Sequence, residues 1–443
     1  MFVARGLELS CQWYFSSCIA GTRWDSSVKY LGDGVNNRQR CRVAVTGMGV
    51  ISPIGNSVEA FWEGLRAGRS GAGPITLFDP ASLPTRIAME VKWDGPIRRD
   101  RKISFALEAA RQAYLAATAC GTTPSGTGGL SLGLGLELFS MPDMLAYLQS
   151  GGRIPESRSE RMSFVQTPSD LCAHLLSRQF NLSEPPHVHV SACAAGTDAI
   201  GTAFRLIASG QRNWLLAGGS DSMINPLGVA GFCRIQAMTT ANVEPERASR
   251  PFDRQRSGFV LGEGAGMLLL EPLELANERG ATVHAEIVGY GSALDAYGIS
   301  EPHPEGQGAF LAMWRALEAA GVNAAEVDCI NAHGTATPKN DPIETLAIKR
   351  LLGKHAYQVP ICATKSMIGH LISAAGAVEA ITAIRCMQEG WVHPTINLED
   401  PDPDCDLDYV PLAGRLHRQQ YVLSNSFGFG GMNASLLMKA INA

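Results

Sequence analysis

Short runs of apolar residues recur along the chain, and glycines follow them closely. Val43–Val45 is followed by Gly47, and Trp214–Ala217 is followed by Gly218. Apolar runs that end in glycine turns are typical of strands buried on both faces of a parallel sheet. The pattern therefore predicts an α/β protein in which helices cover such a sheet.

The predicted elements occur twice in the same order, which indicates an internal duplication. Each half has a helix, a strand, a strand–turn–helix segment and a final strand, with the first helices around Ala106–Ala117 and Ala309–Ala320. We expect two similar halves whose strand-end loops meet at a common centre, and we expect the chemistry there. The helix after each turn has an apolar stripe at helical spacing, formed by Ile200, Phe204 and Ile207 in one half and by Leu371, Val378 and Ile381 in the other.

The composition excludes several classes of protein. Charged residues are 18% of the 443 residues, below the roughly 25% usual in soluble domains, so we expect a buried subunit interface. Lys and Arg number 37 against 42 Asp and Glu, and no block of like charges occurs, so nucleic acid is not expected as a partner. No apolar run reaches the roughly 18 residues of a membrane span, and no membrane association is expected.

Eleven Cys are scattered without CxxC spacing. This pattern favours reduced thiols in a cytoplasmic compartment over a disulfide framework or a zinc site. Residues 1–41 differ from the rest, with clustered aromatic residues and no clear period. Their basic residues suit a targeting peptide, but Glu8, Asp25 and Asp33 do not. We expect a poorly ordered N-terminal extension without a function of its own.

Cys193, in SACAAGTDAIG, follows a predicted strand, His187–Val190, and precedes a helix that begins near Ala194. A thiol at a helix N-terminus lies near the positive end of the helix dipole, which predicts a lowered pKa and a nucleophilic thiolate. By itself, a Cys in a turn of small residues is more often part of a packed core. Two histidines favour the catalytic interpretation.

His333 follows a predicted strand, Val327–Ala332, and His370 opens a helix after the strand Ile361–Thr364. Both therefore lie at strand ends, as Cys193 does. A thiol with two imidazoles supplies a nucleophile and hydrogen-bond donors for developing negative charge, which suits thioester chemistry. Each histidine taken alone also fits a structural role.

Three charged residues stand near the histidines in sequence: Lys365 precedes His370, and Asp341 and Glu344 follow His333. A Lys with a carboxylate partner would fix the loop and hold positive potential beside the histidines. Positions on the surface are the alternative.

Two Gly-rich segments remain. In SFGFGGMN, Ser426–Asn433, the glycines permit close backbone approach, so the amide of Phe429 could serve as an oxyanion donor. A plain tight turn is the alternative. FVLGEGAG, Phe259–Gly266, lacks the full dinucleotide-binding pattern and is interpreted as structural.

In order along the chain, these motifs resemble those of the elongating, type II class of β-ketoacyl-acyl-carrier-protein synthases, in the thiolase-like superfamily. The resemblance extends from about Arg42 to the C-terminus. It implies an α/β fold with duplicated halves in five αβαβα layers, the half 42–290 carrying the nucleophilic Cys and the half 291–443 the His pair. The matching stretches are RVAVTGMGVISPIG, SACAAGTDAIG, RPFDRQRSGFVLGEGAG, NAHGTATPKNDPIET, TKSMIGHLISAAGAVEA, PDPDCDLDYVP and SNSFGFGGMN.

The resemblance also implies a decarboxylative Claisen condensation in fatty acid, related lipid or polyketide synthesis. Cys193 would accept an acyl chain from acyl carrier protein, and His333 and His370 would hydrogen-bond the enolate formed from malonyl-carrier protein. No metal or redox cofactor would take part, and a homodimer is expected, with a heterodimer as the alternative. The remaining implied roles are support by Lys365, Glu344 and Asp341, pantetheine contacts by Thr335 and Thr337, and oxyanion binding and gating by Phe429.

Some positions depart from the family pattern. Gly298 stands where a His is common, Gln236 stands where a basic carrier contact is common, and the segment LGLELFSMPDMLAYLQSGG does not allow the acyl chain length to be inferred. Because carrier proteins are acidic, a basic docking patch is expected. The candidates lie in IRRDRK, and a solvated helix face is the alternative; they are Arg98, Arg99, Arg101 and Lys102.

Three other functions can be weighed against a synthase. A non-catalytic subunit of a heterodimer would lack the nucleophile, whereas Cys193 is present. A Cys-dependent thioester hydrolase would need an activated water, which the sequence does not distinguish from an enolate. A thiolase would need a second Cys near the end of the chain, whereas the last one is Cys405, in an acidic loop.

Overall fold

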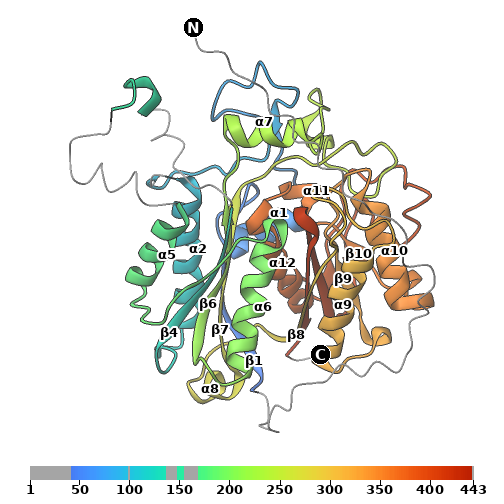
Figure 1. Cartoon of the computed structure of the whole chain (residues 1–443). Helices are drawn as coiled ribbons and strands as arrows, with labels where there is room; N and C mark the ends of the chain where they lie inside the picture. The colour runs from blue at the N-terminus through green and yellow to red at the C-terminus, as the bar shows by residue number, and fades with distance from the viewer. Residues whose placement is uncertain (1–40, 98–99, 136–146, 154–167, 442–443) are drawn as a thin grey trace, which may run out of the picture. The chain divides into compact units, whose positions relative to one another are not determined.

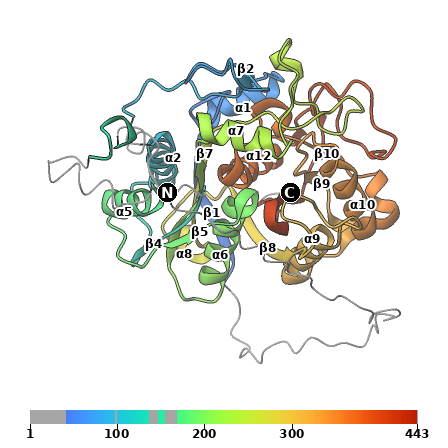
Figure 2. The same cartoon turned by 45° about the horizontal axis from the view of Figure 1, so that its top comes forward.

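The computed structural model describes residues 41–97, 100–135, 147–153 and 168–441. Figures 1 and 2 show the chain in two orientations. Of the predicted N-terminal extension, residues 1–41, only Cys41 is among the described residues.

Ten strands of the described chain form one sheet, in the order β10-β9-β13-β14-β8-β1-β7-β6-β4-β5. Each half contributes five strands, and the two halves join where Val43–Val45 pair with Ala285–Ile287. Numbered along the chain within each half, both sets of strands have the spatial order 3-2-4-5-1, so the predicted duplication is confirmed. The strands are β1 (Val43–Ile51), β4 (Gly128–Leu134), β5 (His187–His189), β6 (Trp214–Asp221) and β7 (Gly264–Pro272), then β8 (Ala285–Leu294), β9 (Cys329–Asn331), β10 (Ile361–Cys362), β13 (Tyr421–Gly428) and β14 (Met432–Lys439).

The sheet is mixed, so the prediction of a wholly parallel sheet is wrong. β5, β4 and β6 run parallel, as do β10, β9 and β13. The last strand of each half, β7 or β14, runs antiparallel to its neighbours. The reason lies in the connection that precedes this strand. After β6 or β13 the chain returns from the same end of the sheet, without the helical crossover that a parallel strand requires.

Helices cover the two parts of the sheet in layers, which agrees with the expected αβαβα arrangement (Figures 1 and 2). α6 and α12 pack against each other and against strands of both halves. α2 and α5 cover the outer face of the first half, and α9, with α10 beside it, covers the second. Their bounds are α2 (Arg101–Ala117), α5 (Pro168–Gln179), α6 (Ala195–Ala208), α9 (Gln307–Ala320), α10 (Asn340–Leu352) and α12 (Ala375–Glu389).

Shorter elements connect these layers. They are α1 (Val58–Arg66), α7 (Pro226–Arg234), α8 (Leu273–Glu278) and α11 (Lys365–Ile368), the two-strand sheets β2 (Gly73–Pro74) with β3 (Ile87–Ala88) and β11 (Trp391–Val392) with β12 (Arg415–Leu416), and six 3₁₀ turns, of which Ala192–Ala194 and Ile372–Ala374 matter most below.

The central helices explain the apolar stripes seen in the sequence. Ile200, Ile207, Val378 and Ile381 are fully buried. This is the outcome expected for helices packed between two layers of sheet, because such helices must be apolar on more than one face. Leu371 is also buried, but it precedes α12, so its predicted place on that helix is wrong.

Candidate active site

Cys193 lies on a sharp bend between β5 and α6. Ala192 has φ 49°, a left-handed conformation that is uncommon for residues other than glycine. A 3₁₀ turn, Ala192–Ala194, follows, and α6 begins at Ala195. The bend aims the thiol inward from the first turn before the helix, and only 2% of the residue is exposed.

The second half repeats this bend. Ile372 has φ 45°, a 3₁₀ turn spans Ile372–Ala374, and α12 begins at Ala375. Ser373 therefore occupies the position that Cys193 has in the first half. The two helices cross closely at their first turns, because a Cβ atom added at Gly376 would lie 2.0 Å from the Thr197 Oγ1.

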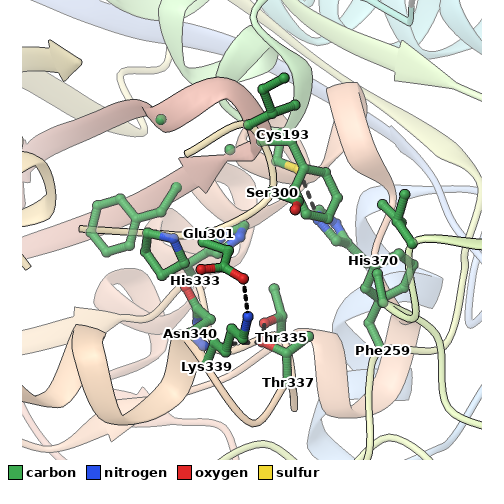
Figure 3. Close-up of a pocket in the computed structure, with 18 of the residues that line it drawn as sticks. Cys193, Phe259, Ser300, Glu301, His333, Thr335, Thr337, Lys339, Asn340 and His370 are labelled. Atoms are coloured by element: carbon green, nitrogen blue, oxygen red, sulfur yellow. Dashed lines mark hydrogen bonds and ion pairs between the residues drawn. The ribbon is translucent and has the colours of Figure 1, made fainter. Parts of the chain in front are cut away.

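His370 contacts the thiol directly. Its Nε2 is 3.0 Å from the Cys193 Sγ, and Figure 3 marks this interaction with a dashed line. The backbone N–H of Ile372 donates to the Nδ1 of His370 at 3.2 Å. A ring nitrogen that accepts a hydrogen bond carries no proton, so Nε2 bears the hydrogen of the neutral ring and points it at the site.

His333 is oriented in a similar way by a different partner. The Nζ of Lys365 lies 3.3 Å from its Nδ1. An ammonium group only donates, so this Nδ1 must accept, and Nε2 again carries the hydrogen. Burial lowers the pKa of both imidazoles well below the usual 6.5, and the Lys365 charge lowers both further. The site thus holds two neutral imidazoles with their Nε2–H groups available as donors.

Burial also raises the pKa of the Cys193 thiol to about 11. The backbone amide of Phe429 and the charge of Lys365 act in the opposite direction but do not compensate. The predicted lowering of the Cys193 pKa is therefore wrong, because the loss of hydration on burial outweighs the electrostatic stabilisation at the helix N-terminus. The thiol carries its proton until a substrate arrives.

Lys365 is bonded to a carboxylate, but not to the one expected. Its Nζ lies 2.5 Å from Oε1 of Glu379, on α12, and both side chains are buried. Glu344 instead accepts hydrogen bonds from the backbone N–H groups of His333 and Gly334, at 2.8 and 2.9 Å. The predicted Lys365–Glu344 pairing is corrected: Glu344 fixes the loop, and Glu379 balances the lysine.

Sequence reasoning missed Glu379, although it lies inside the motif TKSMIGHLISAAGAVEA. An acidic residue in an otherwise apolar central helix was the available signal, because a buried carboxylate needs a partner.

Asp341 does not reach the thiol. It accepts the backbone N–H of Phe252 at 2.8 Å and lies 3.8 Å from Arg256, so it secures a neighbouring loop.

A pocket of about 320 Å³ leads to Cys193 and the two histidines. Thr335 and Thr337 line it and share a hydrogen bond of 3.0 Å between their hydroxyl groups. Phe429 also lines it and stacks on Phe232, with ring centroids 6.4 Å apart. The structure thus brings six of the predicted site residues to one pocket, whereas Lys365, Glu344 and Asp341 do not line it. Lys365 and Glu344 contact His333 from behind.

Comparison with known protein families follows the same division into halves. The β-ketoacyl synthase N-terminal domain matches residues 40–276, and the β-ketoacyl synthase C-terminal domain matches residues 284–399. The chain belongs to the β-ketoacyl synthase family.

Individual β-ketoacyl synthases are similar over nearly their whole length. The chain is 41% identical over 420 residues to 3-oxoacyl-[acyl-carrier-protein] synthase 2 of Coxiella burnetii, covering 91% of this chain and 99% of that protein. It is 41% identical over 413 residues to a protein named putative polyketide beta-ketoacyl synthase 1 of Streptomyces cyaneus, covering 90% of this chain and 97% of that protein.

Solved ketosynthase structures share the fold. One holds a type II polyketide acyl-carrier protein in complex with its ketosynthase, with a TM-score of 0.83 and 32% identity, covering 91% of this chain and 100% of that one. A β-ketoacyl synthase from Burkholderia phymatum has a TM-score of 0.82 and 34% identity at the same coverage.

Two members of the basic run of this β-ketoacyl synthase, Arg101 and Lys102, do not form the predicted surface patch. Lys102 is 1% exposed, and Arg101 is bonded to Glu263 with an N···O distance of 2.5 Å. Lys102 is buried in the first turn of α2, and Arg101 is half-buried against Glu263, in FVLGEGAG, because this buried carboxylate needs a cation. That places this Gly-rich segment in a structural role. Arg98 and Arg99 lie outside the described residues.

Two further observations concern the described part of the synthase. The ligand atoms of Cys193, His333 and His370 lie within 4.8 Å of one another, so these three are the residues that could hold a metal ion. No described helix is both long and apolar enough to cross a membrane.

Proposed function

We propose that this chain is a 3-oxoacyl-[acyl-carrier-protein] synthase that condenses an acyl group on Cys193 with malonyl-carrier protein. One observation carries the proposal: a buried thiol and two neutral imidazole Nε2–H donors converge at the inner end of one pocket. A reaction that loses CO₂ needs donors for an enolate and no strong base, and two neutral imidazoles meet that need.

The first half-reaction transfers the acyl group. The sulfur of Cys193 attacks the thioester carbonyl, the carbon–sulfur bond to the carrier breaks, and the carrier leaves as a thiol with the proton that Cys193 gives up. The backbone N–H groups of Cys193 and Phe429 stabilise the tetrahedral oxyanion. The His370 Nε2–H, 3.0 Å from the sulfur, stabilises the thiolate as it forms.

The second half-reaction forms the new bond. The carboxylate of the malonyl group leaves as CO₂, and its electron pair moves to the thioester oxygen, which accepts hydrogen bonds from His333 and His370. The enolate carbon attacks the acyl carbonyl, and the bond to Cys193 breaks. The thiolate regains a proton, and the product is a carrier-bound β-ketoacyl chain two carbons longer.

Supporting roles follow from the contacts. Lys365, balanced by Glu379, holds the Nδ1 of His333 as an acceptor, and Glu344 fixes the backbone at His333. We assign Thr335 and Thr337 to the pantetheine arm because they line the pocket between its buried and exposed ends. No metal or redox group takes part in these steps.

The partners are acyl carrier protein and a second copy of this chain. β5 is the edge strand beside β4, its central residue Val188 is 40% exposed, and Val190, just after the strand, is 49% exposed. The unpaired backbone groups of an exposed edge strand favour pairing with another chain, and a two-fold axis lets the same strand pair with itself. The scattered, unpaired cysteines of the described residues are consistent with a reducing, cytoplasmic location.

Intact-protein mass spectrometry tests the function. Wild type and Cys193→Ala are mixed with acyl-carrier proteins of different chain lengths, and malonyl-carrier protein is then added. We expect a mass gain that requires Cys193, disappears on malonyl addition and yields a β-ketoacyl carrier. Release of free acid would instead identify a hydrolase, and no acylation at all would favour a non-catalytic subunit.

A further inference from the structure

The exposed end of the pocket carries one cation. The lining runs from Cys193, which is buried, to Lys339, whose side chain is 61% exposed. Among the described residues that line this pocket, Lys339 is the only Lys or Arg. The arm of a carrier protein has a matching polarity, because its thioester end is neutral and its far end is a phosphodiester anion.

Lys339 already holds an anion from the chain itself. It forms an ion pair with Glu301, drawn as a dashed line in Figure 3. Glu301 belongs to the loop between β8 and α9, and it is 49% exposed. Exposed ion pairs of this kind are weak, so a competing anion can replace the carboxylate.

The remaining polar groups around Lys339 leave it available to such an anion. Asp295, the other acidic residue of the lining, is occupied by the backbone N–H groups of His303 and Gly308, at 3.0 and 2.9 Å. Lys339 also caps α10, whose N-terminus favours negative charge. Thr337 lies two residues away, where its hydroxyl accepts the backbone N–H of Asn340 at 3.2 Å.

We propose that Lys339 binds the phosphodiester of the phosphopantetheine arm, and that Glu301 occupies Lys339 until the arm arrives. This inference rests on the proposed function, because it presumes an arm that reaches Cys193. The loop with Glu301 is also attached to the Phe429 turn, since the N–H of Gly430 donates to the carbonyl of Ile299 at 2.6 Å. Exchange of Glu301 for the phosphate therefore releases one attachment of this loop, while the bond to Gly430 remains.

Binding of small arm analogues tests the inference without the carrier protein. The probes are S-methyl-4′-phosphopantetheine and S-methyl-pantetheine, which differ only in the phosphate and cannot react with Cys193. By calorimetry, wild type should bind the phosphorylated probe about three- to ten-fold more tightly, the range of an exposed charge-assisted hydrogen bond. Lys339→Gln should lose this preference, and Glu301→Gln should increase it.

Lys349→Gln is the matched control. Lys349 lies on the same helix, forms an ion pair with Asp406 and does not line the pocket, so this variant should keep the wild-type preference. Equal binding of the two probes by wild type, or a preference that survives in Lys339→Gln, would overturn the inference. Acylation of Cys193 by acyl-pantetheine is measured separately: if it fails while the phosphate preference stands, the condensing function is what is wrong.

Discussion

The buried pair Lys365–Glu379 predicts that its two single substitutions destabilise the chain unequally. The side chains are 1% and 0% exposed, and the two atoms are 2.5 Å apart. Burial raises the pKa of Glu379 to about 7, although the Lys365 ammonium lowers it. This carboxyl is therefore close to taking up a proton at neutral pH, whereas a free lysine stays charged up to about pH 10.4.

The expected magnitudes follow from these pKa values. Lys365→Met leaves a carboxyl that becomes neutral, at an added cost below about 1 kcal/mol at pH 7, because burial already opposes its ionisation in the wild type. Glu379→Gln leaves a buried ammonium group without its partner. Breaking a buried ion pair in this way costs about 3–5 kcal/mol.

Lys365→Met should also change how stability depends on pH. In Lys365→Met, Glu379 has a folded pKa above its unfolded value, so its contribution is complete at low pH and is lost as the pH rises through the folded value.

Urea unfolding followed by tryptophan fluorescence, at pH 7 and 9 and one protein concentration, measures these differences. The double variant Lys365→Met/Glu379→Gln is the control and should be more stable than Glu379→Gln alone. The reasoning is refuted if Lys365→Met loses as much stability as Glu379→Gln at pH 7, or if Lys365→Met does not lose stability, relative to wild type, from pH 7 to 9.

Four further outcomes are expected. Cys193→Ala should lose acyl transfer yet still release CO₂ from malonyl-carrier protein, because both imidazoles remain; a variant that releases none contradicts their assignment, and labelled CO₂ measures it. Gly376→Ala should cost about 1–3 kcal/mol of stability, because its Cβ would lie 2.0 Å from the Thr197 Oγ1, whereas Gly231→Ala, with nothing within 4 Å, should cost nothing; urea midpoints compare the two. Val188→Glu should convert dimers to monomers in analytical ultracentrifugation, and unchanged dimers would exclude β5 from the interface. A chelator should leave the condensation rate unchanged, and activity that returns only on adding metal would contradict a metal-free reaction.

The sequence predicts the fold and the nucleophile well because both depend on local pattern. Strand, glycine turn and helix follow one another around Cys193 and again around His370, and the structure brings these turns together. The duplication was visible for the same reason, since each half repeats the order of its elements along the chain.

Charge partners could not be predicted in this way, because they are set by tertiary contacts. The family resemblance suggested Glu344 for Lys365, whereas packing of α12 brings Glu379 to it from 14 residues further along. The basic run that contains Lys102 was expected to form a surface patch, whereas the Lys102 side chain points from α2 into the core. The pKa of Cys193 depends on how completely the site excludes water, which no local pattern reports.

The strand order has a consequence for how the chain is made. β9 pairs with β13, so Cys329–Asn331 meets partners, Val422–Ser424, that the ribosome delivers about ninety residues later. The second half of the sheet stays incomplete until β14, near the C-terminus, has been synthesised. Until then, the face of α6 that packs against β14 in the folded chain stays exposed. Long-range strand pairing of this kind is slow and leaves apolar surface open to aggregation. We therefore expect the nascent chain to need protection by chaperones late in synthesis, and truncations that remove β13 and β14 to leave the second half of the sheet incomplete.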